Sequence, residues 1–382
     1  MKKTVFFGLL ATLLLCIPAS HAEETGTVTA HPDPNKAIPI SLTGYSGVVL
    51  DVLKTDLEVQ GFSVVTDQAQ FSVTGTSSPV KGALMDNTKT YRFNRAYSGD
   101  DRSAAHTLAD DIVFAILKIK GIGHSKIVFK SQNGTAAELF LSDFDGSNPI
   151  AVTSDRVNVG SPAWIPGTRA LLYSSWKSGF PDIVIHDLFS GERRSFAKYP
   201  GSNLSPSVSP DGKKVAMILS KGGSPDLYVC DIDGKNLRQL TKGSDDESSP
   251  CWSPDSSKIC FVSRFATRPS LFVLPVDGGT PRRLSVGGVS NITEPDWSPD
   301  GKTIAFTAQG GGFNICTIPA EGGTANIITE GEDPAWASNS RTVIFTRRES
   351  GKRVLSLLDV PTKHVKDIHR ISGSCSQACW AR

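Results

Sequence analysis

One module of about 44 residues recurs through the last two thirds of the chain and limits what it can fold into. Its copies contain segments such as SPSVSPDGKKVAMILS and EPDWSPDGKTIAFTA. Aligned on one proline in each copy, the spacings are 44, 44, 45 and 39 residues, at Pro162, Pro206, Pro250, Pro295 and Pro334. A fixed period of about 40 to 45 residues with several short strands in each unit is the sequence signature of a β-propeller.

Strand counting within these WD40-like repeats predicts the number of blades. Each copy offers four short strands, as in PCW, KICFVS, SLFVLPV and PRRLS, separated by turns of the type Ser-Pro-Asp-Gly. Six second strands occur, but only five follow a Pro-x-Trp strand. The missing first strand is Ala378-Cys379-Trp380, at the far end of the chain. Since an unpaired edge is a liability, residues 124–382 are predicted to form a six-bladed β-propeller closed by the C-terminal strand.

The region before the repeats predicts a different kind of structure. Residues 23–123 show no 44-residue period, and strand-like and helix-like segments alternate. Apolar residues follow a helical period over 48–59 and again over 103–118, where Ser103 could cap the second helix. We therefore expect an N-terminal α+β domain of two helices on a mixed sheet, placed ahead of the all-β propeller.

The first 22 residues have the features of a secretory signal peptide. Lys2 and Lys3 precede an apolar run over 5–17, and Ser20-His21-Ala22 resembles a cleavage site. The run is short for a membrane span, so an exported protein without direct membrane insertion is expected. Removing two of 40 basic residues leaves 38, which balance 38 acidic ones. A nearly neutral chain argues against nucleic acid as a partner.

Cysteine and histidine spacing provides no metal or cofactor motif. Six cysteines follow the signal segment, and export permits disulfides, but their pairing cannot be deduced from spacing. Most of these cysteines fall in predicted strands, where they are expected to act as small buried apolar side chains. No CxxC pair or His pair has the spacing of a structural zinc site. We expect no cofactor and no metal.

Catalytic motifs are missing in the same way. His106 and Asp110 are spaced i, i+4 on the second predicted helix and could form a base and its orienting acid. No recognisable nucleophile motif accompanies them, so a pair at the helix surface or a domain interface is favoured. The chain is therefore not expected to be an enzyme.

Binding residues are expected at one mouth of the propeller, in the loops that lead into the first strand of each blade. These loops are rich in Ser, Asn, Asp, Glu and Thr, and solvated polar loops are an alternative of nearly equal weight. The residues predicted to bind a protein or peptide are Asn203, Ser205, Glu247, Ser248, Asn291, Thr293, Glu294, Glu332 and Asp333. The repeated tryptophans could form a stacking platform, but packing between blades is favoured.

The repeats and the N-terminal motifs together resemble the TolB family of periplasmic proteins of the Tol–Pal system. Asp56-Leu57 with Gly61-Phe62 matches one family pattern. Ala105, His106, Ala109, Asp110 and, with one shift, Ile112 match the family's second helix. The resemblance implies a periplasmic, non-enzymatic scaffold, expected to be a monomer, that supports outer-membrane integrity, envelope constriction at cell division and protein import.

The same resemblance implies two partners. The propeller mouth would bind the peptidoglycan-associated lipoprotein Pal, and the mature N-terminus, over residues 23–31, would engage a TolA-like protein. Within the loop that looks like the family's mouth loop, Thr293 and Glu294 are the strongest single candidates.

Two alternatives stay open. One is a propeller enzyme, such as a periplasmic lyase or a peptidase relative. The mouth loops contain no His, Lys or Arg, which argues against it. The other is a sugar- or peptidoglycan-binding propeller, which would need exposed tryptophans.

Overall fold

A computed structural model describes residues 33, 35–243, 245–264 and 268–381. The predicted signal peptide, 1–22, and the predicted TolA-binding stretch, 23–31, lie outside the described residues. The boundaries expected after residues 22 and 123 remain predictions.

The N-terminal region contains two helices and a five-stranded mixed sheet, as expected. The sheet order is β2-β1-β3-β4-β5, with β1 parallel to β2 and β3 and the other pairs antiparallel. Its elements are β1 (Ile38–Thr43), α1 (Gly47–Glu58), β2 (Phe62–Val64), β3 (Phe71–Ser77), β4 (Val80–Asp86), β5 (Tyr91–Ala96) and α2 (Asp101–Leu117).

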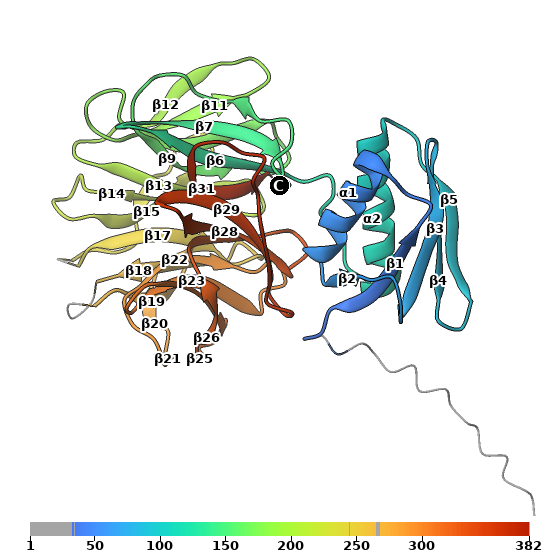
Figure 1. Cartoon of the computed structure of the whole chain (residues 1–382). Coiled ribbons are helices and arrows are strands. Elements are labelled where there is room, and N and C mark those ends of the chain that lie inside the picture. Colours follow the sequence, from blue (N-terminus) through green and yellow to red (C-terminus); the bar gives the residue numbers. More distant parts are fainter. Residues whose placement is uncertain (1–32, 34, 244, 265–267, 382) are drawn as a thin grey trace, which may run out of the picture. The chain divides into compact units, whose positions relative to one another are not determined.

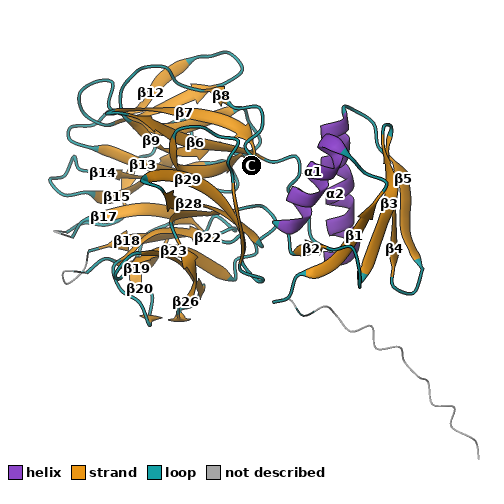
Figure 2. Ribbon diagram, in the orientation of Figure 1, coloured by secondary structure: helices purple, strands orange, loops and turns teal. Residues whose placement is uncertain are grey.

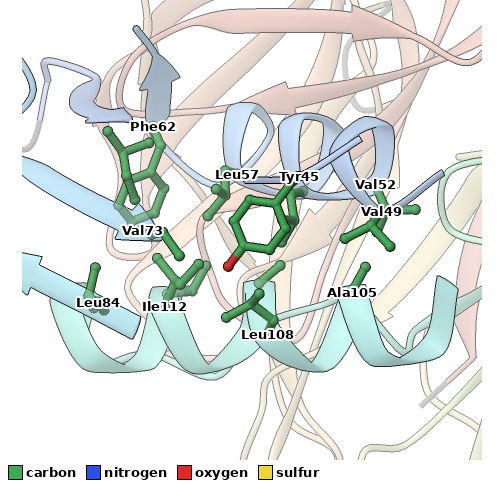
Figure 3. Packing of buried hydrophobic residues seen from close by; sticks show 14 of the residues in the cluster. Tyr45, Val49, Val52, Leu57, Phe62, Val73, Leu84, Ala105, Leu108 and Ile112 are labelled. Carbon is green, nitrogen blue, oxygen red and sulfur yellow. The ribbon is translucent and has the colours of Figure 1, made fainter. Parts of the chain in front are cut away.

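The helices of this region lie side by side and cover one face of the sheet (Figure 1). Figure 3 shows Leu57 of α1 and Leu108 and Ile112 of α2 packed with strand residues such as Leu84 in one apolar core. The helical period in the sequence arises because α1 and α2 each bury one apolar stripe. Ser103 does not cap α2. Asp100 does, and its carboxylate accepts the Ser103 N–H at 2.9 Å.

The described part of the repeat region forms six four-stranded sheets, the blades of a β-propeller, and Figure 2 shows this region built from strands. Blade 1 contains β31 (Ser374–Ala381), β6 (Lys126–Asn133), β7 (Ala136–Asp143) and β8 (Ile150–Ala151). Blade 2 contains β9 (Val159–Trp164), β10 (Ala170–Ser175), β11 (Asp182–Asp187) and β12 (Arg193–Ala197). Blade 3 contains β13 (Asn203–Val208), β14 (Lys214–Leu219), β15 (Asp226–Asp231) and β16 (Arg238–Gln239).

The remaining blades follow the same pattern. Blade 4 contains β17 (Glu247–Trp252), β18 (Lys258–Ser263), β19 (Ser270–Pro275) and β20 (Arg282–Arg283). Blade 5 contains β22 (Ile292–Trp297), β23 (Thr303–Gln309), β24 (Phe313–Pro319) and β26 (Asn326–Glu330). Blade 6 contains β27 (Glu332–Trp336), β28 (Thr342–Glu349), β29 (Lys352–Asp359) and β30 (His364–Asp367). A short parallel pair, β21 (Val286–Gly287) and β25 (Gly323–Thr324), lies beside them.

The predicted closure of the ring is confirmed. The C-terminal strand β31 pairs antiparallel with β6, with Trp380 opposite Ile127 and Cys379 opposite Val128. Trp380 is buried, donates its indole N–H to the Ala335 carbonyl at 2.9 Å, and stacks with Phe144. The last strand of the chain therefore fills the inner position of the first blade.

The repeated tryptophans mainly pack between blades, as predicted. Trp252, Trp297, Trp336 and Trp380 are buried, while Trp164 is half-buried. Trp252 links neighbouring blades by donating its indole N–H to the Ser207 carbonyl at 2.9 Å. The burial of these four rings leaves little aromatic surface for a sugar-stacking platform.

Candidate functional site: the ring of residues around the propeller channel

Six equivalent residues, one from each blade, surround the channel of the propeller. Each lies in the innermost strand of its blade at a β-bulge, where the register with the second strand shifts. All six have positive φ, between 49° and 57°, although none is glycine: Ser161, Ser205, Ser249, Glu294, Asp333 and Gln377. Left-handed backbone is uncommon for such residues and is found preferentially at functional sites.

Side chains of this ring hydrogen-bond the backbone of the next blade. Glu294 Oε2 accepts the Asp333 N–H at 3.0 Å, Asp333 Oδ2 accepts the Gln377 N–H at 3.3 Å, and Gln377 Oε1 accepts the Ser161 N–H at 3.0 Å. Between blades 2 and 3 the acceptor for the N–H of Ser205 is not the ring residue of blade 2, Ser161. The Ser205 N–H donates instead to Ser174 Oγ, in the second strand of blade 2, at 3.2 Å. The side chains of Glu294, Asp333 and Gln377 therefore link blade 5 to blade 6, blade 6 to blade 1 and blade 1 to blade 2.

The ring encloses a cavity of about 400 Å³ in the channel. Prolines of the innermost strands form much of its wall, and the six ring residues line it among them. Ser205, Glu294 and Asp333, all predicted from the sequence, line this cavity together with Ser161, Ser249 and Gln377. A rigid hollow with a few fixed polar groups suits the recognition of a partner's side chain.

The acidic side of the ring holds its carboxyl groups close together. Burial raises the pKa of Asp333 well above its ordinary value, and the nearby carboxyls of Glu294 and Glu332 add to the effect. Glu294 also accepts the Thr307 hydroxyl at 2.7 Å. A proton or a donor from a partner would therefore be favoured at this position.

The other predicted residues lie one to three positions before the ring. Asn203 is fully buried, and its amide donates to the Tyr199 carbonyl at 2.9 Å, so its role is to hold the loop. Glu332 is buried and pairs with Arg353 at 2.8 Å. Residues closer to solvent at this mouth are Ser248, Asn291 and Thr293, which are partly buried.

Glu247, also predicted from the sequence, belongs to a buried carboxyl pair. Its carboxyl group accepts the Ser263 hydroxyl at 3.1 Å, and the second carboxyl of the pair, Asp226, is buried nearby. Burial raises the pKa of Glu247 to about 7, from an ordinary 4.5, and the charges of Asp226 and Asp245 raise it further. Burial also raises the pKa of Asp226.

This pair predicts a pH-dependent stability. The native state binds the Glu247 proton more tightly than the unfolded chain does. The contribution of this proton to the free energy of unfolding is therefore complete below about pH 4.5 and is lost as the pH rises to about 7. Glu247→Gln stays neutral and should be more stable than the wild type at pH 8 by roughly 1–3 kcal/mol, with near equality at pH 4.5. Urea unfolding at both pH values measures this difference.

Asp246→Asn, at an exposed neighbouring position, is the matched control and should follow the wild-type profile. Parallel pH profiles for Glu247→Gln and the wild type would contradict the assignment.

Three ring residues were missed in the sequence: Ser161, Ser249 and Gln377. Their place in the repeat could have identified them. Ser161 and Ser249 directly precede the aligned prolines, and Gln377 precedes Ala378, which begins the missing first strand. Ser205 and Ser248 were predicted, but nothing in the chemistry of a serine distinguishes Ser161 and Ser249 from the other serines of these loops.

His106 does not pair with Asp110, and neither does it lie on the helix surface. It is buried, and its Nδ1 lies 2.6 Å from Oδ2 of Asp56 on α1. Asp110 instead accepts the Gly123 N–H at 2.8 Å. Burial raises the pKa of Asp56 to about 6 even though its bond to His106 opposes the shift. Burial alone would lower the pKa of His106, but the bond to Asp56 and its charge give a net rise.

Among the described residues, no three His, Cys, Asp or Glu side chains converge in a way that could hold a metal ion. Neither described helix has the length and apolar content that a membrane crossing requires.

Comparison with known proteins places the chain in a family. The family model for the TolB β-propeller domain matches residues 115–382. The chain belongs to the TolB β-propeller family. Two curated relatives are both called Tol-Pal system protein TolB. The one from Haemophilus ducreyi is 38% identical over 103 residues, which are 27% of this chain and 24% of the relative. The one from Bordetella pertussis is 32% identical over 128 residues, 32% of this chain and 29% of the relative.

These matches span about a quarter of the length of the curated relatives. Structural similarity extends further. The crystal structure of TolB from Acinetobacter baumannii superposes with a TM-score of 0.82 at 24% identity, covering 91% of this chain and 98% of that one. This similarity confirms the predicted fold, an α+β N-terminal region followed by a six-bladed propeller.

Proposed function

We propose that the protein is a non-enzymatic periplasmic scaffold of a Tol–Pal system that binds a Pal-like lipoprotein at the propeller mouth. The observation that carries the proposal is the ring of six left-handed residues around the cavity, with its polar side chains held by inter-blade hydrogen bonds. Membership of the TolB family and the names of the curated relatives support it. In this role the protein would support outer-membrane integrity, envelope constriction at division and protein import.

Binding to a purified, soluble Pal domain tests the proposal. Thr293→Ala removes a partly exposed hydroxyl beside the ring, and we expect Pal affinity to fall about tenfold or more, as for a residue at the centre of an interface. Glu294→Gln keeps an oxygen that can accept the Asp333 N–H but removes the charge, and should also weaken binding. Calorimetric titration measures both dissociation constants.

Thr280→Ala, an exposed threonine between β19 and β20, is the matched control and should bind Pal like the wild type. Wild-type affinity in both Thr293→Ala and Glu294→Gln, in folded proteins, would contradict the proposed site.

A TolA-like partner is proposed for the mature N-terminus. Deletion of residues 23–31 should abolish capture of a TolA-like domain while Pal binding is retained. Capture by the shortened protein at wild-type strength would place the TolA contact elsewhere in the chain.

A further inference from the structure

Two cysteines face each other across the first two strands of blade 4. Cys251 of β17 and Cys260 of β18 are paired residues of the antiparallel ladder. Both side chains pack in the core cluster that blade 4 shares with blade 5, so they lie on the same face of the blade. Residues directly opposite each other in antiparallel strands have Cα atoms about 4.5–5.5 Å apart, and disulfides join Cα atoms about 4.4–6.8 Å apart. The strand register therefore places the two thiols where a cross-strand disulfide can form.

This pair departs from the repeat at both of its positions. In the other blades the position of Cys251 is occupied by Ala163, Ser207, Asp296, Ala335 and Cys379. The position of Cys260 is occupied by Leu172, Ala216, Ala305, Ile344 and Val128. Alanine thus suffices at the first position in blades 2 and 6 and at the second in blades 3 and 5. Packing alone therefore does not require cysteine at either position of blade 4.

The other cysteines of the described chain face residues without sulfur. Across the strand pairs, Cys230, Cys316, Cys375 and Cys379 lie opposite Val215, Phe306, Ser131 and Val128. Cys375 and Cys379 are four residues apart on β31, about 13 Å in extended backbone. That separation exceeds the limit of about 7 Å between the Cα atoms of a disulfide. Strand register thus selects one pairing that the spacing in the sequence left open.

A β-bulge beside Cys251 gives such a bond a structural role. The register between β17 and β18 shifts between Ser248 and Cys251. Within the bulge, Ser249 has left-handed backbone with φ of 49°, and Pro250 has no N–H to donate to the ladder. Pairing resumes at Cys251, which also lines the channel cavity. A disulfide at this pair would fix the register next to the bulge and hold the innermost strand in the channel wall.

The environment of the two thiols indicates when the bond forms. Cys251 is 6% exposed and Cys260 is 0% exposed, so the folded protein gives an oxidant little access to either. The neighbouring Cys260 thiol, and then burial, raise the pKa of Cys251 well above its ordinary value. Because the thiolate is the attacking species, the pair reacts slowly once it is folded. The bond is therefore expected to form during folding, before blade 5 covers the two strands.

We propose that Cys251 and Cys260 are joined by a structural disulfide in the exported protein. One of the two thiolates attacks a sulfur of a disulfide oxidant, and the oxidant's other sulfur leaves as a thiolate. The second cysteine thiolate then attacks the mixed disulfide and releases the remaining sulfur of the oxidant. The two cysteines lose two electrons and two protons, and the oxidant becomes two thiols. The inference rests on the proposed periplasmic location for its oxidant, and it does not depend on Pal binding.

Refolding in a glutathione buffer tests the pairing in the full chain. Protein unfolded in urea and reduced is refolded with reduced and oxidised glutathione, alkylated in urea, and digested without reductant. Mass spectrometry should find the Cys251 and Cys260 peptides joined, two hydrogens lighter than the two separate peptides. The other cysteines should carry the alkyl group. Folded, reduced protein in the same buffer should form the bond roughly tenfold more slowly or less.

Thermal unfolding measures the effect of the bond on stability. Since the disulfide closes a loop of ten residues, reduction should lower the Tm of the oxidised protein by about 3–8 °C. Cys251→Ala and Cys260→Ala place the residue of other blades at these positions, so both should fold, and their Tm should not respond to reductant. Cys230→Ala is the matched control. It removes a buried cysteine that faces Val215 and should keep the wild-type response to reductant.

Three results would overturn the proposal. They are alkylation of both cysteines after oxidative refolding, linkage of either one to another cysteine, and alkylation of both in protein taken from the periplasmic fraction of expressing cells. A chain that is absent from that fraction would contradict the proposed location, and the refolding experiment would still decide the disulfide.

Discussion

Trp380→Ala should lower the free energy of unfolding by about 3–5 kcal/mol, the usual cost of emptying a buried tryptophan site. The side chain is 4% exposed, and it packs in the core cluster that joins blades 1 and 6, together with Phe129, Ile344 and Leu357. Its loss also frees the Ala335 carbonyl, which accepts the indole N–H. Urea unfolding followed by fluorescence and circular dichroism measures the change.

Trp164→Ala provides the matched control. It occupies the same position in the first strand of blade 2 but is only half-buried, so its loss should cost clearly less. Truncation after residue 373 extends the test by removing the whole of β31, which leaves the inner edge of β6 unpaired. We expect the truncated chain to lose cooperative unfolding. Equal costs for Trp164→Ala and Trp380→Ala would contradict the role of the C-terminal strand in closing the ring.

His106→Ala should be the second strongly destabilising change, at about 3–5 kcal/mol, because it leaves the Asp56 carboxyl buried without its partner. Asp56 is fully buried and His106 is 4% exposed, with 2.6 Å between Oδ2 and Nδ1. The double variant Asp56→Leu/His106→Leu replaces the pair by apolar side chains and should lose less than His106→Ala alone. Urea unfolding of Asp56→Leu, His106→Leu and the double variant measures the coupling.

Asp111→Ala is the control on the same helix. Asp111 pairs with Arg95 at 2.7 Å and accepts the Tyr97 hydroxyl at 2.9 Å, but its side chain is partly exposed, so the expected cost is only about 1–2 kcal/mol. If His106→Ala cost no more than Asp111→Ala, the buried pair would contribute nothing special to the N-terminal region.

The propeller was predictable because its evidence is local and repeated. Each copy carries its own turn residues and apolar strands, so an error in one copy is corrected by the others. The closure by Trp380 followed from counting, since a ring of four-stranded blades cannot leave one first strand missing. The helices α1 and α2 were found to within two residues at each end from their apolar period.

The candidate site was only partly predictable. Acids and amides such as Glu294 and Asp333 were chosen for their chemistry, and both line the channel cavity. The buried role of Asn203 could not be seen, because a polar residue in a loop reads the same whether it faces solvent or holds the backbone. Ser161, Ser249 and Gln377 were missed because their importance comes from backbone conformation and position in the ring.

The sequence alone determined the six blades, the C-terminal closure and the two-helix N-terminal region, because periodicity and turn residues specify strands, helices and their order. The tertiary structure decided which side chains meet. It paired His106 with Asp56, 50 residues away, in place of Asp110, and it joined Glu294, Asp333, Gln377 and Ser161 in one inter-blade chain of hydrogen bonds. Such contacts depend on how separate elements are packed in space, and no local pattern in the chain records that packing.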